Sequence, residues 1–132
     1  MNLNFKPNGY TSVSPYIIIN GAQQFIDLMK VVFDAKELRC FDRPDGTIMH
    51  AEIQLDDSVI MLGDGSEKYP PVPSVLHVYV TNVDETFKKA INAGCEVVQQ
   101  PKQMEGDDDK RGTFMDFGGN MWSVATEIKS KL

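Results

Sequence analysis

The side chains best suited to chemistry lie in the segment 47–62, TIMHAEIQLDDSVIML. Its residues alternate between two faces: Ile48, His50, Glu52 and Gln54 on one, and Met49, Ala51, Ile53 and Leu55 on the other. Such alternation, broken by the short polar turn 56–58, is typical of a β-hairpin with one dry face. His50 and Glu52 are two residues apart and therefore share a face. An imidazole beside a carboxylate can move a proton or ligate a metal ion.

The second half of the chain carries a similar pattern. Val75, His77 and Tyr79 alternate with Leu76, Val78 and Val80, and a strand–turn–strand follows in GTFMDFGGNMWSVATE, with its turn at 118–120. This pattern puts Ser123 on one face of the last strand and Trp122 on the other, in the core. If His77 approached His50 and Glu52, the three could hold Zn²⁺, Fe²⁺ or Ni²⁺. We favour the other interpretation, in which His50 and Glu52 hydrogen-bond each other or cross-strand partners in a half-buried wall.

Two capped helices position these strands. Asn20 with Gln23, and Asn82 with Glu85, have the spacing of an N-cap and its capping-box partner. The apolar residues that follow recur at helical spacing: Ala22, Phe25, Ile26, Met29, Val32 and Phe33 in the first helix, and Val83, Phe87, Ala90 and Ile91 in the second. Strands are expected at 14–19, 36–41, 75–80 and 95–99, a linker at 63–74, a polar loop at 101–111 and an N-terminal arm at 1–13, whose Phe5 and Tyr10 can pack against the body.

The order strand, helix, strand, hairpin recurs after about sixty residues, which indicates an internal repeat. We predict a βαβββ unit at 14–63 and a second at 74–128, in a single domain spanning 1–132. Each unit has one helix for one sheet face, so its other face must pack or enclose something. The expected fold is α+β, with two βαβββ units forming a curved mixed sheet, helices outside and a cleft inside.

Composition excludes several classes of function. The 132-residue chain has a net charge of −6, so it lacks the basic surface that binds nucleic acid or an anionic membrane. Cys40 and Cys95 have no metal-ligand spacing, and free thiols are favoured over a disulfide. The sequence has neither a signal peptide nor an apolar stretch of about 20 residues, which predicts a soluble, cytoplasmic protein.

Four blocks of the chain carry a family resemblance: SPYIIINGAQQFIDLMKVVFDAKEL, PDGTIMHAEIQLDDSVIMLGD, LHVYVTNVDETFKKAINAGCEVV and KRGTFMDFGGNMWSVAT. In order and spacing, from Ser14 to Thr126, they resemble the vicinal-oxygen-chelate superfamily. This superfamily includes glyoxalase I, extradiol dioxygenases, and bleomycin- and fosfomycin-resistance proteins. The likeness is greatest to the glyoxalase-like branch of the phosphonate-operon type.

The resemblance locates the metal positions of the superfamily. Metal-dependent members place one ligand, usually His or Glu, on each of four cleft-lining strands. The matching positions here hold Ser14, Met61, Val75 and Ser123. These side chains are not a ligand set for a catalytic divalent ion. We therefore expect no metal at the usual site and no cofactor; a metal bound elsewhere would be Zn, Ni or Fe.

The resemblance also implies a cleft that binds a small molecule. Its predicted substrate-binding residues are Tyr16, His50, Glu52, Met61, His77, Tyr79 and Ser123. We expect a homodimer that binds its ligand as bleomycin-resistance proteins do, and the acidic chain suits a cationic or neutral ligand. The alternative is a divalent-metal-dependent lyase, isomerase or dioxygenase with a relocated His/Glu site. A third is a regulatory or structural subunit that kept the fold. The sequence assigns no catalytic residue.

Overall fold

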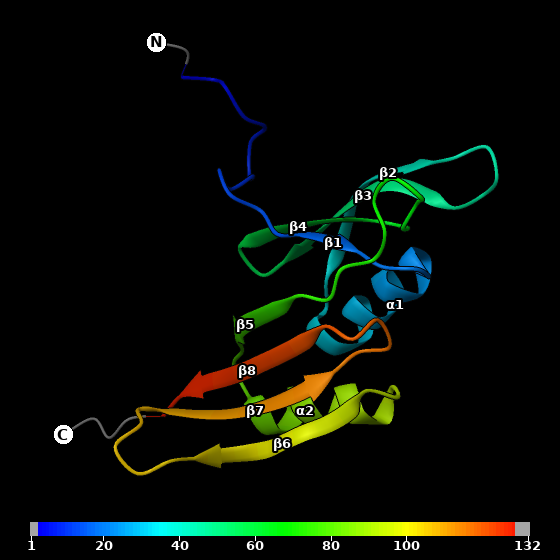
Figure 1. Ribbon diagram of the computed structural model, residues 1–132. Helices are drawn as coiled ribbons and strands as arrows, with labels where there is room; N and C mark the ends of the chain where they lie inside the picture. Colours follow the sequence, from blue (N-terminus) through cyan, green and yellow to red (C-terminus); the bar gives the residue numbers. More distant parts are fainter. Residues whose placement is uncertain (1–2, 129–132) are drawn as a thin grey trace. The chain divides into compact units, whose positions relative to one another are not determined.

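The computed structural model describes residues 3–128, and the chain divides between Val72 and Pro73 into two compact units. Each unit has one helix and its own four-stranded mixed sheet, as Figure 1 shows. This confirms the predicted α+β class and the two βαβββ units. The single domain and the cleft between the units stay predictions. Neither helix of the described part is long and apolar enough to cross a membrane.

The first unit is built on a sheet of order β1-β4-β3-β2. Its strands are β1 (Tyr16–Ile18), β2 (Lys36–Asp42), β3 (Ile48–Leu55) and β4 (Ser58–Gly63). β1 runs parallel to β4, and the other pairs are antiparallel. Helix α1 (Ala22–Phe33) packs against β3 and buries five residues of its predicted apolar stripe, Ala22, Phe25, Ile26, Met29 and Val32, whereas Phe33 at its end is half-buried. The opposite face of this sheet is the one that α1 does not cover.

Helix α1 begins differently from the prediction. Its N-cap residue is Gly21, in a left-handed conformation with φ 89°. Asn20 does not cap the helix, because the N-cap residue makes no side-chain hydrogen bond. Instead Asp64, just after β4, accepts hydrogen bonds from the backbone N–H groups of Gly21 (2.9 Å) and Ala22 (3.0 Å). Its other oxygen accepts from the N–H of Ile48 (2.7 Å). A carboxylate distant in sequence thus satisfies the positive helix end.

Strand β3 contains an irregularity that alters the predicted faces. Phe41 pairs with His50 and Asp42 with Ile48, which leaves Met49 as the extra residue of a β-bulge. Ile48 is consequently buried and Met49 is 52% exposed, the reverse of the faces that strict alternation predicts. From Ala51 to Leu55 the dry face is buried as expected.

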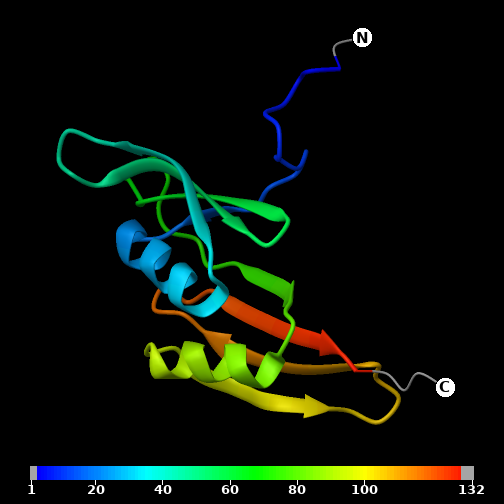
Figure 2. The same cartoon turned by 180° about the vertical axis from the view of Figure 1, so that it is seen from behind.

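The second unit repeats this topology, with order β5-β8-β7-β6. Its strands are β5 (Val75–Tyr79), β6 (Glu96–Gln103), β7 (Asp109–Met115) and β8 (Met121–Glu127), with helix α2 (Val83–Asn92) across one face (Figure 2). Asn82 caps α2 as predicted, accepting from the N–H of Glu85 at 3.1 Å. The predicted loop 101–111 is too long, because β6 and β7 extend into it. β6 is an edge strand whose exposed positions tolerate the polar residues that suggested a loop.

A buried carboxylate organises the end of the second sheet. Asp116 accepts hydrogen bonds from the Trp122 indole (2.9 Å), from the Asn120 side chain (3.0 Å) and from the backbone N–H of Gly118 (2.9 Å). Trp122 is fully buried and stacks with Phe114, which confirms its predicted place in the core.

Both cysteines are free thiols, as expected. Cys40 is exposed, whereas Cys95 is buried. Burial raises the pKa of Cys95 to about 11, so this thiol stays protonated and unreactive at neutral pH.

Candidate functional site

A row of side chains crosses the face of the first sheet that lies opposite α1. The strand register places Tyr16 beside Met61, Met61 beside Glu52, and Glu52 beside Arg39. Paired residues of neighbouring strands share a sheet face, and His50 joins them two residues before Glu52. Four of the predicted site residues, Tyr16, His50, Glu52 and Met61, therefore lie on one face.

Glu52 is the centre of this row and is only 3% exposed. One carboxylate oxygen accepts a hydrogen bond from the Tyr10 phenol (2.5 Å), and the other contacts His50 Nε2 (2.8 Å). The Arg39 guanidinium lies 3.6 Å from the carboxylate and over the Tyr10 ring. Burial by itself raises the pKa of Glu52, but the hydrogen bonds from His50 and Tyr10 and the charge of Arg39 outweigh it. The pKa is lowered overall, so Glu52 is ionised at neutral pH.

His50 connects this carboxylate to Tyr16. Its Nδ1 lies 2.9 Å from the Tyr16 hydroxyl, and the two ring centroids are 5.5 Å apart. Phe41 stacks on the imidazole at 6.4 Å. Burial raises the pKa of the Tyr16 phenol, which is therefore protonated at neutral pH. The result is a continuous hydrogen-bonded chain from Tyr10 through Glu52 and His50 to Tyr16.

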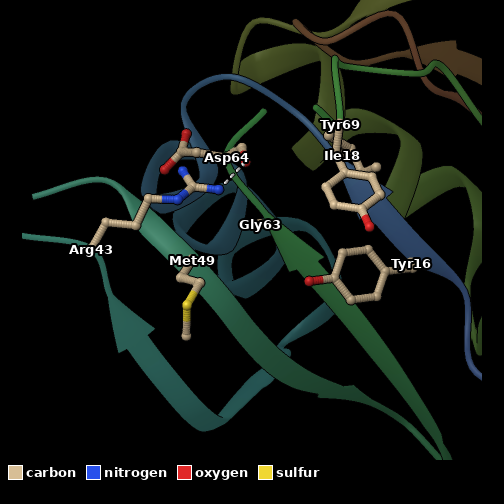
Figure 3. A pocket seen from close by; sticks show the side chains of 7 residues that line it. All are labelled: Tyr16, Ile18, Arg43, Met49, Gly63, Asp64 and Tyr69. Atoms are coloured by element: carbon tan, nitrogen blue, oxygen red, sulfur yellow. Dashed lines mark hydrogen bonds between the residues drawn. The ribbon is translucent and has the colours of Figure 1, made fainter. Parts of the chain in front are cut away.

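Tyr16 also lines a pocket with a volume of about 380 Å³. The other lining residues are Ile18, Arg43, Met49, Gly63, Asp64 and Tyr69. Figure 3 shows the rings of Tyr16 and Tyr69 on one side of the pocket and the side chains of Met49 and Arg43 on the other. This volume and this mixture of apolar walls with a few polar groups are typical of small-molecule sites.

Sequence reasoning missed most of this pocket. Of the seven predicted substrate-binding residues, only Tyr16 is among the side chains that line it. Arg43 enters it from the turn before β3, where it donates to the Thr47 hydroxyl (3.1 Å) and to the backbone carbonyl of Asp64 (3.0 Å). Met49 reaches it through the β-bulge. Neither position has a local pattern that could have revealed it.

The remaining predicted site residues belong to the second unit. His77 Nδ1 lies 3.0 Å from the Ser123 hydroxyl, and the Tyr79 phenol donates to Asp109 at 2.7 Å. The hydrogen bond to Asp109 raises the pKa of Tyr79. Asp109 is buried at the start of β7, although the sequence predicts a solvated acidic loop there. The convergence of His77 with His50 and Glu52 stays a prediction, because the two groups lie in different units.

The residues present do not fit the metal site of the fold. The positions that the resemblance assigns to metal ligands hold two hydroxyls, a thioether and an alkyl side chain: Ser14, Met61, Val75 and Ser123. Val75 is 80% exposed and has no donor atom, and the Ser123 hydroxyl is engaged with His77. Within residues 3–128, no group of three or more His, Cys, Asp or Glu side chains is arranged to hold a metal ion.

Solved structures identify the fold. TioX from Micromonospora sp. ML1 matches with a TM-score of 0.69 and 21% identity, over 92% of this chain and 100% of that one. The PhnB protein from Bacillus cereus matches with a TM-score of 0.70 and 15% identity, over 88% and 99% of the two chains. The fosfomycin resistance protein FosX from Listeria monocytogenes, complexed with Mn(II) and sulfate, matches with 0.69 and 12%, over 89% and 90%. All have the glyoxalase-like, or vicinal-oxygen-chelate, fold. These identities show the fold without selecting the phosphonate-operon branch.

Relatives are also found by sequence. No family model matches the chain. The uncharacterized protein Mb0911c of Mycobacterium bovis is 31% identical over 141 residues, which cover 98% of this chain and 89% of the relative. The uncharacterized protein Rv0887c of Mycobacterium tuberculosis has the same identity, over 98% and 79% of the two chains. This chain therefore belongs to the family of these mycobacterial proteins, and its fold is the glyoxalase-like one.

Proposed function

We propose that this protein binds a small molecule in the manner of bleomycin-resistance proteins, as a homodimer and without the usual metal of its fold. The observation that carries the proposal is the pocket beside Tyr16. It is large enough for a molecule of two or three rings, and it lies next to a hydrogen-bonded chain that ends on its wall. The side chains at the metal positions support the metal-free part of the proposal.

Titration of the full ¹⁵N-labelled chain with small bicyclic probes tests this proposal. Indole, indene and 1-indanone have similar size and shape and differ in hydrogen-bonding groups. We expect at least one of them to shift the backbone amide signals of Gly63 and Asp64, which line the pocket. If all three probes, each added up to its solubility limit, leave these signals unchanged, the pocket is not a site for such molecules and the proposal fails.

A matched pair of variants locates the binding. Met49 lines the pocket and is 52% exposed, whereas Met104, outside it in the second unit, is 49% exposed. Met49→Trp fills the cavity and should weaken probe binding at least about ten-fold, since the ring occupies the volume that the probe needs. Met104→Trp adds the same bulk elsewhere and should leave binding unchanged. Equal effects of the two substitutions would contradict the assignment of the pocket.

An enzymatic function is the second candidate, because an ionised carboxylate contacts an imidazole that bonds to a pocket-lining phenol. Under this alternative function, the protein is a divalent-metal-dependent lyase, isomerase or dioxygenase whose relocated metal site includes His50 and Glu52. Elemental analysis after dialysis without chelator, on the wild type and His50→Ala, separates the candidates. Stoichiometric Zn, Ni or Fe that disappears in the variant would support the enzyme and contradict the metal-free proposal.

A further inference from the structure

We infer that the pocket selects small, flat, apolar molecules that carry an N–H or O–H donor, because the chain from Glu52 through His50 makes the Tyr16 oxygen a hydrogen-bond acceptor toward the ligand. This inference rests on the proposed function, since it requires that the pocket beside Tyr16 binds a small molecule. It adds the chemical class of the ligand and names the residues that determine it.

The direction of the hydrogen-bonded chain is fixed at Glu52. An ionised carboxylate only accepts hydrogen bonds, and Tyr10 already donates to its other oxygen. His50 Nε2 must therefore carry the proton in the 2.8 Å contact with Glu52. The assignment at Nδ1 holds for the neutral imidazole, which has a single N–H: with that proton on Nε2, Nδ1 is unprotonated and accepts. At Tyr16, 2.9 Å away, the O–H is the donor.

This assignment decides what Tyr16 offers to a ligand. Its only proton is directed to His50, and the lone pairs that the phenol oxygen keeps are its means of bonding to a molecule in the pocket. The carboxylate of Asp64, which also lines the pocket, already accepts three hydrogen bonds from backbone N–H groups, two on one oxygen and one on the other, so little of its accepting capacity is left for a ligand. The Tyr16 oxygen is thus an acceptor in the pocket, beside the apolar surface of Ile18 and Met49, whereas the Tyr69 phenol, whose O–H has both roles, favours neither kind of ligand.

Arg43 lines the opposite side of the pocket and offers hydrogen-bond donors there. Two of its five N–H donors are used, by Thr47 and by the carbonyl of Asp64, so three can bond to a ligand acceptor. Figure 3 places it opposite the Tyr16 ring. A ligand can therefore also present an acceptor to Arg43, and this contact is independent of the preference for a donor at Tyr16.

Replacing Glu52 by Gln should weaken or reverse the direction of the hydrogen bonds from Tyr16 to His50 and from His50 to residue 52. Tyr10 donates to Oε1, which favours the amide oxygen at that position and directs the amide NH₂ toward His50. A donating amide would move the imidazole proton to Nδ1, which would then donate to Tyr16 and leave the phenol O–H for the ligand. Asp109→Asn is the matched control, because it makes the same carboxylate-to-amide change beside Tyr79 in the second unit.

The experiment combines a direct reading of the proton with a binding comparison. The full chain, labelled with ¹⁵N-histidine, has only His50 and His77, so long-range ¹H–¹⁵N spectra at pH 8.5 report the tautomer of each. Titrations with indole, indene and 1-indanone then compare a donor, a probe without polar groups and an acceptor. In the wild type and in Asp109→Asn, we expect the Nε2–H tautomer of His50 and tighter binding of indole than of indene by at least about five-fold. In Glu52→Gln this preference should fall below about two-fold, and 1-indanone should bind more tightly than in the wild type.

Each outcome decides a different point. An Nδ1–H tautomer in the wild type overturns the inference whatever binds. Equal affinity of the wild type for indole and indene also overturns it, but leaves the proposed function standing because the pocket still binds molecules of this shape. If no probe binds, the proposed function fails and the inference with it. If the Glu52→Gln variant does not fold, the tautomer of His50 in the wild type and the ratio of its affinities for indole and indene still test the inference.

Discussion

Glu52 is a carboxylate kept ionised inside the protein by its partners. Its lowered pKa means that the folded state holds this proton less tightly than the unfolded chain, where the value is near the ordinary 4.5. Its stabilising contribution is therefore complete above that pH and is lost as the pH falls through the lower folded value. The network of Tyr10, Arg39 and His50 should consequently be part of the acid sensitivity of this protein.

Comparison with Glu52→Gln isolates this contribution. The glutamine side chain does not titrate and loses the charge that strengthens the two hydrogen bonds, so we expect a free energy of unfolding about 1–2 kcal/mol lower at pH 7. Urea denaturation between pH 7 and pH 3 should show this difference narrowing below about pH 4.5. A difference that stays constant over the whole range would show that Glu52 does not titrate differently in the folded state.

Tyr10 holds the N-terminal arm to the sheet through the same carboxylate. Tyr10→Phe removes a hydrogen bond to a buried charged group and should lower the free energy of unfolding by about 1.5–3 kcal/mol. Tyr69→Phe, the control, removes a hydroxyl from an exposed ring and should cost less than about 0.5 kcal/mol. Thermal and urea denaturation measure both, and equal stability of the two variants would show that the arm contributes nothing through Tyr10.

How far the sequence predicts this site depends on distance along the chain. His50 and Glu52 are two residues apart, so the period of a strand is enough to put them on one face. Tyr10 and Glu52 are separated by 42 residues, and their contact follows from the path of an arm that has no periodic pattern. Composition alone gives no sign that Arg39 would lie over the Tyr10 ring.

At the scale of elements, the start of α1 depends on Asp64 rather than on its local sequence. Asp64→Ala leaves three backbone N–H groups without their acceptor and should lower the free energy of unfolding by about 2–3 kcal/mol. Asn20→Ala, at the position that the sequence predicts as the cap, should change it by less than about 0.5 kcal/mol. Asn82→Ala, which removes the confirmed cap of α2, should cost about 1 kcal/mol. A larger effect at Asn20 than at Asp64 would contradict this assignment.

The elements themselves were predictable where one pattern dominates. The apolar stripe of α1, the cap of α2 and the hairpin of β3 and β4 follow from periodicity and turn residues. The bulge at Met49 could not be predicted in this way. It depends on how β3 pairs with β2, and no proline or glycine in the sequence indicates its position. One inserted residue was enough to exchange the environments of Ile48 and Met49, and with them one wall of the pocket.

The whole molecule repeats one topology with two different sets of side chains. Both sheets have the same strand order, yet the described pocket beside an ionised carboxylate belongs to the first unit. In the second unit the corresponding first strand, β5, carries His77 and Tyr79, which bond to Ser123 and Asp109. The repeat therefore explains the fold, whereas the function must be argued separately for each unit.

The predicted homodimer can be tested at this scale. Val75 and Tyr79 share one face of β5 and are 80% and 60% exposed in the single chain, and neighbouring exposed apolar side chains of this kind favour burial against another surface. We expect sedimentation equilibrium to give twice the chain mass of 14.8 kDa for the wild type. Val75→Glu places a charge on that surface and should shift the protein to the single-chain mass, because burying an unpaired carboxylate is costly.

Val13→Glu is the control for charge alone. Val13 is 86% exposed in the N-terminal arm, so the same substitution there should leave the dimer intact. Circular dichroism on both variants separates dissociation from unfolding, since a dissociated but folded protein keeps its β-sheet signal. A wild-type mass of one chain would contradict the dimer, and dissociation of both variants would mean that net charge rather than the β5 surface controls assembly.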